Sequence, residues 1–126
     1  TNGLLTMSNL YNNSGQTFKT QITESGSDPV VTIDASSFTE AVYRIYAADC
    51  TTVLVEKKLS VPTEIVVIAD VDQYGNTINV FKTTLTAADM TMAAGQYKHQ
   101  FVVTNSDNLK LPPVFQNTVT IVEVCD

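Results

Sequence analysis

The residues of this chain that could do chemistry are few and scattered. His99 is its single histidine, and Cys50 and Cys125 are its two cysteines. A multi-histidine metal site therefore cannot form, and a Ser-His-Asp catalytic arrangement would have to use His99. His99 shares one face of an alternating stretch with Tyr97 and Phe101, so we expect a structural or surface imidazole rather than a general base.

The cysteines and the acidic residues show little sign of a redox or metal site. Cys50 and Cys125 lack the Cys-x-x-Cys spacing of redox and zinc sites, and we expect free thiols, with a disulfide as the alternative. Residues 70–75 open like a calcium-binding loop, but Tyr74 and Phe81 stand where such a loop needs oxygen ligands. We therefore expect a solvated turn there, no metal, no cofactor and no catalytic residue.

The charge and hydropathy patterns exclude two classes of partner. Seven Lys and Arg against 13 Asp and Glu give a formal net charge of −6. The longest basic run is Lys57-Lys58, so we expect neither nucleic acid nor an anionic membrane surface as a partner. The longest apolar run, 65–69, is far shorter than the roughly 20 residues of a spanning helix, and no signal peptide is visible.

The elements that must position these side chains are strands. Val, Ile and Thr number 16, 7 and 18, and β-branched residues suit pleated sheets better than helices. No stretch has a helical apolar stripe or a crossover long enough for parallel strands, so we expect antiparallel sheets in a sandwich or barrel. The predicted strands are 16–23, 30–33, 41–47, 52–59, 64–70, 77–85, 96–104 and 114–124. We expect strand 64–70 to be buried on both faces or shielded by a neighbour.

The stretch from Asp89 to Tyr97 is the most informative one. Thr86 and Asp89 have the spacing of a capped helical turn, and Gly95 ends that turn. An Asp, a small-residue turn and a Tyr that opens the next strand are typical of the tyrosine corner of immunoglobulin-like sandwiches. Asp89, Gly95 and Tyr97 are the candidate residues, and a buried Tyr without a special partner is the alternative.

The first 15 residues have poor periodicity. We interpret 1–15 as an N-terminal arm and 16–126 as one domain. Scattered apolar side chains make the arm a candidate for docking on a neighbouring chain, although a frayed terminus explains it equally well. The candidate docking residues are Leu4, Leu5, Leu10 and Tyr11.

Four stretches together resemble a known family, the immunoglobulin-like domains of tailed-bacteriophage virion proteins, such as the N-terminal domain of baseplate upper proteins and related head or tail accessory proteins. They are the Gly-x-Thr-Phe start at 15–22, the Pro-Val run at 29–34, the segment 85–97 and the Thr- and Val-rich strand at 117–122. The segment 85–97 is the most specific. The chain departs from the family at Met92 and at 115–117, where a Leu and a Gly are usual.

The resemblance implies an antiparallel immunoglobulin-like β-sandwich of seven to eight strands with a structural role in the virion. The expected function is decoration of the capsid or a bridge between virion parts, with other virion proteins as partners and a homo-oligomer, for example a trimer at a symmetry axis. A tail or baseplate adaptor is one alternative, and a pilin-like surface module is another. A third is a receptor- or carbohydrate-binding sandwich that uses Tyr43, Tyr46, Tyr74 and Tyr97; an enzyme is the least favoured class.

Overall fold

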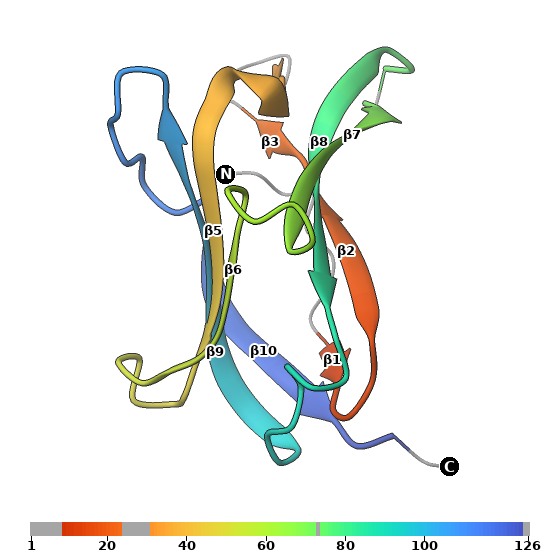
Figure 1. Cartoon of the computed structure of the whole chain (residues 1–126), viewed down its shortest axis with the longest axis vertical. Helices are drawn as coiled ribbons and strands as arrows, with labels where there is room; N and C mark the ends of the chain where they lie inside the picture. Colours follow the sequence, from red (N-terminus) through yellow and green to blue (C-terminus); the bar gives the residue numbers. More distant parts are fainter. Residues whose placement is uncertain (1–8, 24–30, 73, 125–126) are drawn as a thin grey trace.

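The computed structural model describes residues 9–23, 31–72 and 74–124. In these ranges the chain is all-β, with one turn of 3-10 helix, η1 (Ala35–Ser37), before the first long strand (Figure 1). The strands are β1 (Asn9–Tyr11), β2 (Gln16–Thr20), β3 (Ile22–Thr23), β4 (Thr32–Ile33), β5 (Phe38–Tyr46), β6 (Val53–Lys58), β7 (Ile65–Val71), β8 (Thr77–Leu85), β9 (Gly95–Asn105) and β10 (Phe115–Val122).

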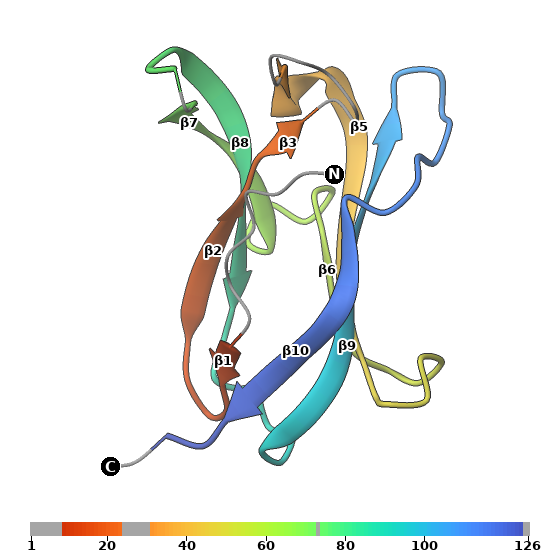
Figure 2. The same ribbon diagram turned by 180° about the vertical axis from the view of Figure 1, so that it is seen from behind.

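The strands form two main sheets that face each other. One has the order β1-β10-β9-β5-β6 and the other β2-β8-β7, while β3 and β4 pair as a short separate ribbon. The view from behind shows the two sheets as separate layers, with β10 and β9 in one and β2 and β8 in the other (Figure 2). The all-β prediction is confirmed, and each long strand lies within a few residues of its predicted range.

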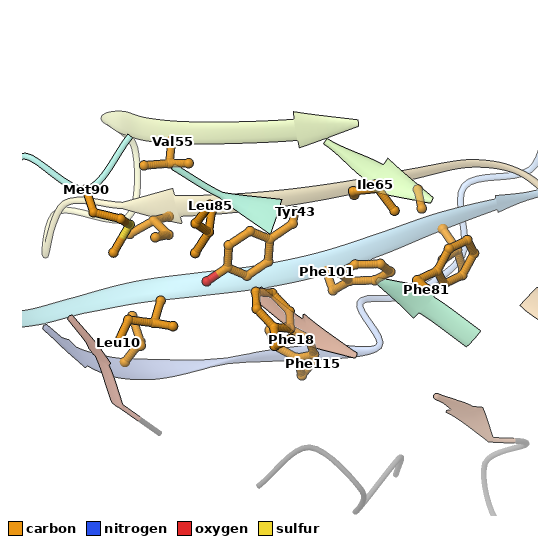
Figure 3. Packing of buried hydrophobic residues seen from close by; sticks show 14 of the residues in the cluster. Leu10, Phe18, Tyr43, Val55, Ile65, Phe81, Leu85, Met90, Phe101 and Phe115 are labelled. Atoms are coloured by element: carbon orange, nitrogen blue, oxygen red, sulfur yellow. The ribbon is translucent and has the colours of Figure 1, made fainter. Parts of the chain in front are cut away.

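Aromatic side chains join the two layers. Alternation along β5 and β9 turns Tyr43 and Phe101 inward, where both are fully buried. The Tyr43 ring lies 4.9 Å from that of Phe18 on the opposite sheet, and Phe101 lies 5.5 Å from Phe81 (Figure 3). Edge-on and tilted pairs at such distances are favourable beyond the area they bury, so they fix how the sheets stack.

The prediction of purely antiparallel sheets is wrong at one pair. β1 runs parallel to β10, with Leu10 opposite Ile121. A parallel pair needs a long connection, and here nearly the whole domain lies between the two strands in sequence. Leu10 is fully buried in the core, so the chain's own sandwich takes up part of the predicted arm.

The apolar strand β7 is not enclosed as its sequence suggested. β7 lies at the edge of the three-stranded sheet and pairs only with β8. Val66 and Val71 are 39% and 56% exposed. The run of apolar residues in this strand therefore does not report burial on both faces, and within the described residues β7 has no strand beside its outer edge.

Candidate functional site

His99 is buried inside the sandwich and fully engaged. Its side chain is 2% exposed, with Nδ1 2.9 Å from the Tyr43 hydroxyl and Nε2 2.6 Å from Oδ1 of Asn117. The Asn117 oxygen can only accept, so Nε2 carries the proton and Tyr43 donates to Nδ1. Burial lowers the pKa of His99 to about 4, although the bond to Asn117 opposes this shift, and burial raises the pKa of Tyr43. The imidazole is neutral near pH 7, and both of its nitrogens are occupied.

The predicted corner residues lie between the end of β8 and the start of β9, but Asp89 bonds to Thr86 and Lys57 and takes no part in the hydrogen bond made by Tyr97. The Tyr97 hydroxyl donates to the backbone oxygen of Ala93, four residues upstream, at 2.7 Å. Gly95 opens the strand with φ +153°, a conformation that residues with a Cβ rarely adopt. Asp89 accepts from the backbone N and the hydroxyl of Thr86, at 2.7 and 2.9 Å, which closes a hydrogen-bonded turn where the spacing predicted a capped helical turn.

Lys57 is a residue whose role the sequence did not reveal. It is 7% exposed, and its Nζ lies 2.7 Å from Oδ2 of Asp89 and 3.8 Å from Oε2 of Glu64. Partial burial raises the pKa of Asp89, but the bonds from Lys57 and Thr86 outweigh that effect and the net pKa is lowered. Lys57 points inward, unlike its neighbour Lys58, because side chains alternate along β6.

The predicted docking residues separate. Leu10 is buried in this chain's core, which corrects the expectation that it docks on a neighbour, because its side chain already packs between the sheets. Tyr11 is 48% exposed beside it, as alternation requires. Leu4 and Leu5 lie outside the described residues. Cys50 is an exposed thiol in the β5–β6 turn, and its expected state relative to Cys125 is untested because Cys125 also lies outside them.

The outer face of the five-stranded sheet carries a hollow of about 310 Å³. Tyr46 accepts a hydrogen bond from Nε2 of Gln100 at 2.9 Å, and Nζ of Lys98 donates to Thr118 at 2.8 Å. These bonds link side chains across three neighbouring strands, β5, β9 and β10. The residues that line the hollow are Tyr46, Cys50, Lys98, His99, Gln100, Gln116 and Asn117.

A second, smaller hollow of about 80 Å³ continues this face. It shares Gln100 with the first hollow and includes Arg44 and Lys110. Arg44 donates from Nε to Glu56 at 2.6 Å, and this bond raises the pKa of the guanidinium and lowers that of Glu56. The two hollows together form a shallow trough along β5 and β9, in which polar and charged side chains lie beside Val42 and Val102; we call it the outer-face trough.

The trough differs in charge from the chain as a whole. Alternation and register place Arg44, Lys58 and Lys98 on this face, with Lys110 beside Thr104 at its end. The acidic residues on the same face are Glu40 and Glu56, whereas the whole chain carries −6. Alternation in 96–104 could have identified Lys98 and Gln100, but not the neighbours that register brings beside them.

The calcium-loop resemblance has a different explanation in the structure. The Oδ1 of Asp72 accepts from the backbone N of Tyr74 and of Asn76, both at 2.9 Å, so this carboxylate closes its own turn and its pKa is lowered. Across 9–23, 31–72 and 74–124, no three acidic, His or Cys side chains gather as metal ligands would. No helix in those ranges has the length and hydropathy to cross a bilayer.

Comparisons with family models, curated proteins and solved structures gave no match.

Proposed function

We propose that this chain is a non-enzymatic, immunoglobulin-like structural protein of a bacteriophage virion, which decorates the capsid or bridges virion parts. Its partners are then other virion proteins, such as the major capsid protein or neck and tail proteins, together with its own copies. It reaches the virion during assembly in the cytoplasm of the host bacterium. The sequence resemblance motivates this proposal, and three structural features support it.

The strand order supports the immunoglobulin-like part. Variable-type immunoglobulin sandwiches place strands G, F, C and C′ in one sheet and B, E and D in the other. The orders β10-β9-β5-β6 and β2-β8-β7 follow that scheme when the strands are lettered along the chain, and β1 adds a strand beside β10. The Tyr97 hydroxyl, bonded to backbone four residues upstream near the start of β9, has the geometry of the tyrosine corner.

The use of the reactive groups supports a non-enzymatic role. His99 is buried and bonded at both nitrogens, and Asp89 is held by Lys57 and Thr86. Although His99 is among the residues that line the larger hollow, neither of its nitrogens is left free to act on a bound molecule. A protein built this way acts through the surfaces it presents.

The observation that carries the docking role is the charge of the outer-face trough. Basic side chains predominate there although the chain is acidic, so the face attracts an acidic partner and orients the chain as it approaches. The bound Gln100 and Lys98 side chains lose little further rotamer freedom when a partner docks. We place the contact with another virion protein on this face.

Fractionation of particles tests the proposal. Antibody against the purified chain is used to probe density-gradient fractions of a culture whose genome encodes it. We expect the chain in the fractions that contain DNA-filled particles; recovery only from particle-free fractions overturns the virion assignment. Lys98→Glu is expected to lower incorporation at least tenfold, whereas Lys19→Glu, a charge-matched change on the other sheet (side chain 55% exposed), is expected to leave it unchanged. Equal incorporation of both variants would place the contact elsewhere.

A carbohydrate- or receptor-binding role is the second candidate, favoured by the size of the larger hollow. Its volume of about 310 Å³ is at the lower end for small-molecule pockets, and Tyr46 supplies an aromatic wall. The four tyrosines expected to share such a site do not converge. Tyr43 is buried, Tyr97 closes its own turn, and Tyr74 is exposed on the β7–β8 turn. A glycan array with the purified chain and Tyr46→Ala tests this role, since only a hit lost in the variant supports it.

A further inference from the structure

The edge strand β7 lacks the features that usually keep sheet edges apart. Exposed edges are normally interrupted by lysines, prolines, bulges or short length. β7 has seven residues with the sequence IVVIADV, of which only Asp70 is charged, and its pairing with β8 shows no register shift. Among the other edges in the described part of the chain, β6 carries Glu56 and Lys58, β2 carries Lys19, and β1 has three residues.

Two hydrogen bonds show which backbone groups of β7 face outward. Thr84 donates from its backbone N to Glu64 at 2.9 Å, and Asp72 donates to Asn76 at 2.9 Å. Hydrogen-bonded and non-bonded positions alternate along an antiparallel pair, so the even-numbered residues of β7 bond to β8. The odd-numbered residues therefore direct their N–H and C=O groups away from the sheet.

Only the middle of this outward row has free donors. The N–H of Ile65 bonds to Val61, at 3.4 Å, and that of Val71 to the side chain of Asp70, at 2.9 Å. Val67 and Ala69 lie between them, and within the described residues no acceptor is found for their outward N–H groups. Each therefore presents one donor and one acceptor at the edge, flanked by the exposed side chain of Val66.

We propose that β7 pairs antiparallel with β7 of a second copy of this chain, joining two three-stranded sheets into one. Val67 of each copy then faces Ala69 of the other, and each pair exchanges both backbone hydrogen bonds. Because the same two residues supply donors and acceptors on both sides, a two-fold axis satisfies all of them at once, and the contact closes at two copies. The inference does not depend on the virion assignment, and a trimer would need a different contact.

The charges beside the edge favour a second copy as the occupant. The two-fold axis brings Asp70 of each copy next to Val66 of the other, and Lys82 is the residue paired with Val66 on β8. Lys82 makes no ion pair within the described residues, whereas Asp70 is 3.5 Å from Lys19. Each end of the proposed β7–β7 pairing therefore places the Asp70 carboxylate of one copy near the unpaired Lys82 ammonium of the other. The two Asp70 side chains lie at opposite ends of the pairing.

Light scattering coupled to size exclusion tests the pairing on the full chain. We expect the mass to rise with concentration from 13.7 kDa to twice that value. Ala69→Pro removes one outward N–H but no bond to β8, a position where an edge strand tolerates proline. This variant is expected to stay monomeric at every concentration. Thr17→Pro, at an outward N–H position on the opposite edge of the same sheet, is the matched control and is expected to dimerise as the parent does.

Amide hydrogen exchange measured by NMR on the unaltered chain gives an independent readout. The amides of Val67 and Ala69 are expected to become protected as concentration rises, while those of Val66 and Ile68 are protected throughout. A monomer at all concentrations overturns the proposal. So does a dimer in which Val67 and Ala69 still exchange freely, or an open-ended polymer that Ala69→Pro does not prevent.

Discussion

The hydroxyl of Tyr43 on β5 lies 2.9 Å from Nδ1 of His99 on β9, inside the sandwich. Asn117 on β10 holds the other nitrogen, so a chain of hydrogen bonds crosses three adjacent strands of one sheet. Buried polar groups stabilise a fold only when all of them are bonded. This chain is complete from Tyr43 to the exposed Asn117, which explains how the single histidine can be buried.

The first prediction concerns acid stability. The pKa of His99 falls from 6.5 to about 4 on folding, because burial disfavours the charged ring. Below pH 6.5 the unfolded chain therefore binds a proton that the folded chain does not, and stability falls as pH decreases toward 4. We expect the free energy of unfolding to drop by about 2 kcal/mol from pH 7 to pH 5.

Urea unfolding at a series of pH values measures this loss. His99→Gln replaces the imidazole with an amide that can still form hydrogen bonds but does not titrate, so the stability of this variant should be flat between pH 7 and pH 5. The carboxylates affect stability in a separate, lower pH range. Hydrogen bonds from Ser36 lower the pKa of Asp34 to about 2, so the stability that Asp34 contributes is lost only below about pH 4. An NMR titration of the single histidine that gives a pKa near 6.5 would contradict the prediction.

The second prediction concerns the hydroxyl of Tyr43. Tyr43→Phe keeps the ring contact with Phe18 but leaves Nδ1 of His99 buried without a donor. We expect a loss of about 1–3 kcal/mol in the free energy of unfolding, measured in urea. Tyr46→Phe removes a hydroxyl from the outer face, where water can replace the bond to Gln100, and it should change stability by less than about 0.5 kcal/mol. Equal losses in both variants would show that the buried chain has no special role.

The strands were predictable because alternation is a local property. In 96–104 the inward set Tyr97, His99, Phe101 and Val103 follows directly from a period of two, and the structure keeps it. Turn positions were also readable from Gly, Asn and Asp. The exception is β7, where a continuous apolar run is compatible with an edge as well as with a central strand.

Contacts between distant strands were not predictable, because they depend on register. Nothing near Lys57 in sequence indicates Asp89, yet the fold brings their charged atoms to 2.7 Å. The outer-face trough has the same origin, since Tyr46, Lys98 and Thr118 become neighbours only through the pairing of β5, β9 and β10. Leu10 was assigned to a docking arm because a three-residue strand gives too short a pattern to recognise.

The third prediction concerns the buried ion pair of Lys57 and Asp89. Asp89→Ala leaves the Lys57 ammonium, 7% exposed, with Glu64 at 3.8 Å as its one remaining charged partner among the described residues. We expect a loss of about 1.5–3 kcal/mol in the free energy of unfolding. Glu56→Gln breaks the outer pair with Arg44, whose side chains are about one-third exposed, and should cost less than about 1 kcal/mol. Differential scanning calorimetry of the two variants compares these losses. An equal fall in Tm would contradict the prediction that the buried pair contributes more to stability than the exposed pair.

The fourth prediction separates backbone strain from packing at Gly95. A Cβ built there would meet nothing closer than Cε2 of Tyr97 at 3.9 Å, so space is available. The φ of +153° is the obstacle, because residues other than glycine avoid it. Gly95→Ala should therefore destabilise the chain by more than about 1 kcal/mol through the backbone alone.

Gly15→Ala is the matched control for this substitution. Its Cβ would lie 3.8 Å from the backbone oxygen of Leu85, an ordinary contact, and its φ lies outside the left-handed range. Alanine should be neutral or slightly stabilising at Gly15, because it reduces the freedom of the unfolded chain. In chemical unfolding experiments, Gly95→Ala should therefore lower the free energy of unfolding, whereas Gly15→Ala should leave it unchanged or raise it slightly. If Gly95→Ala were as well tolerated as Gly15→Ala, the turn before β9 would have relaxed, and the bond from Tyr97 to Ala93 would be expected to break with it.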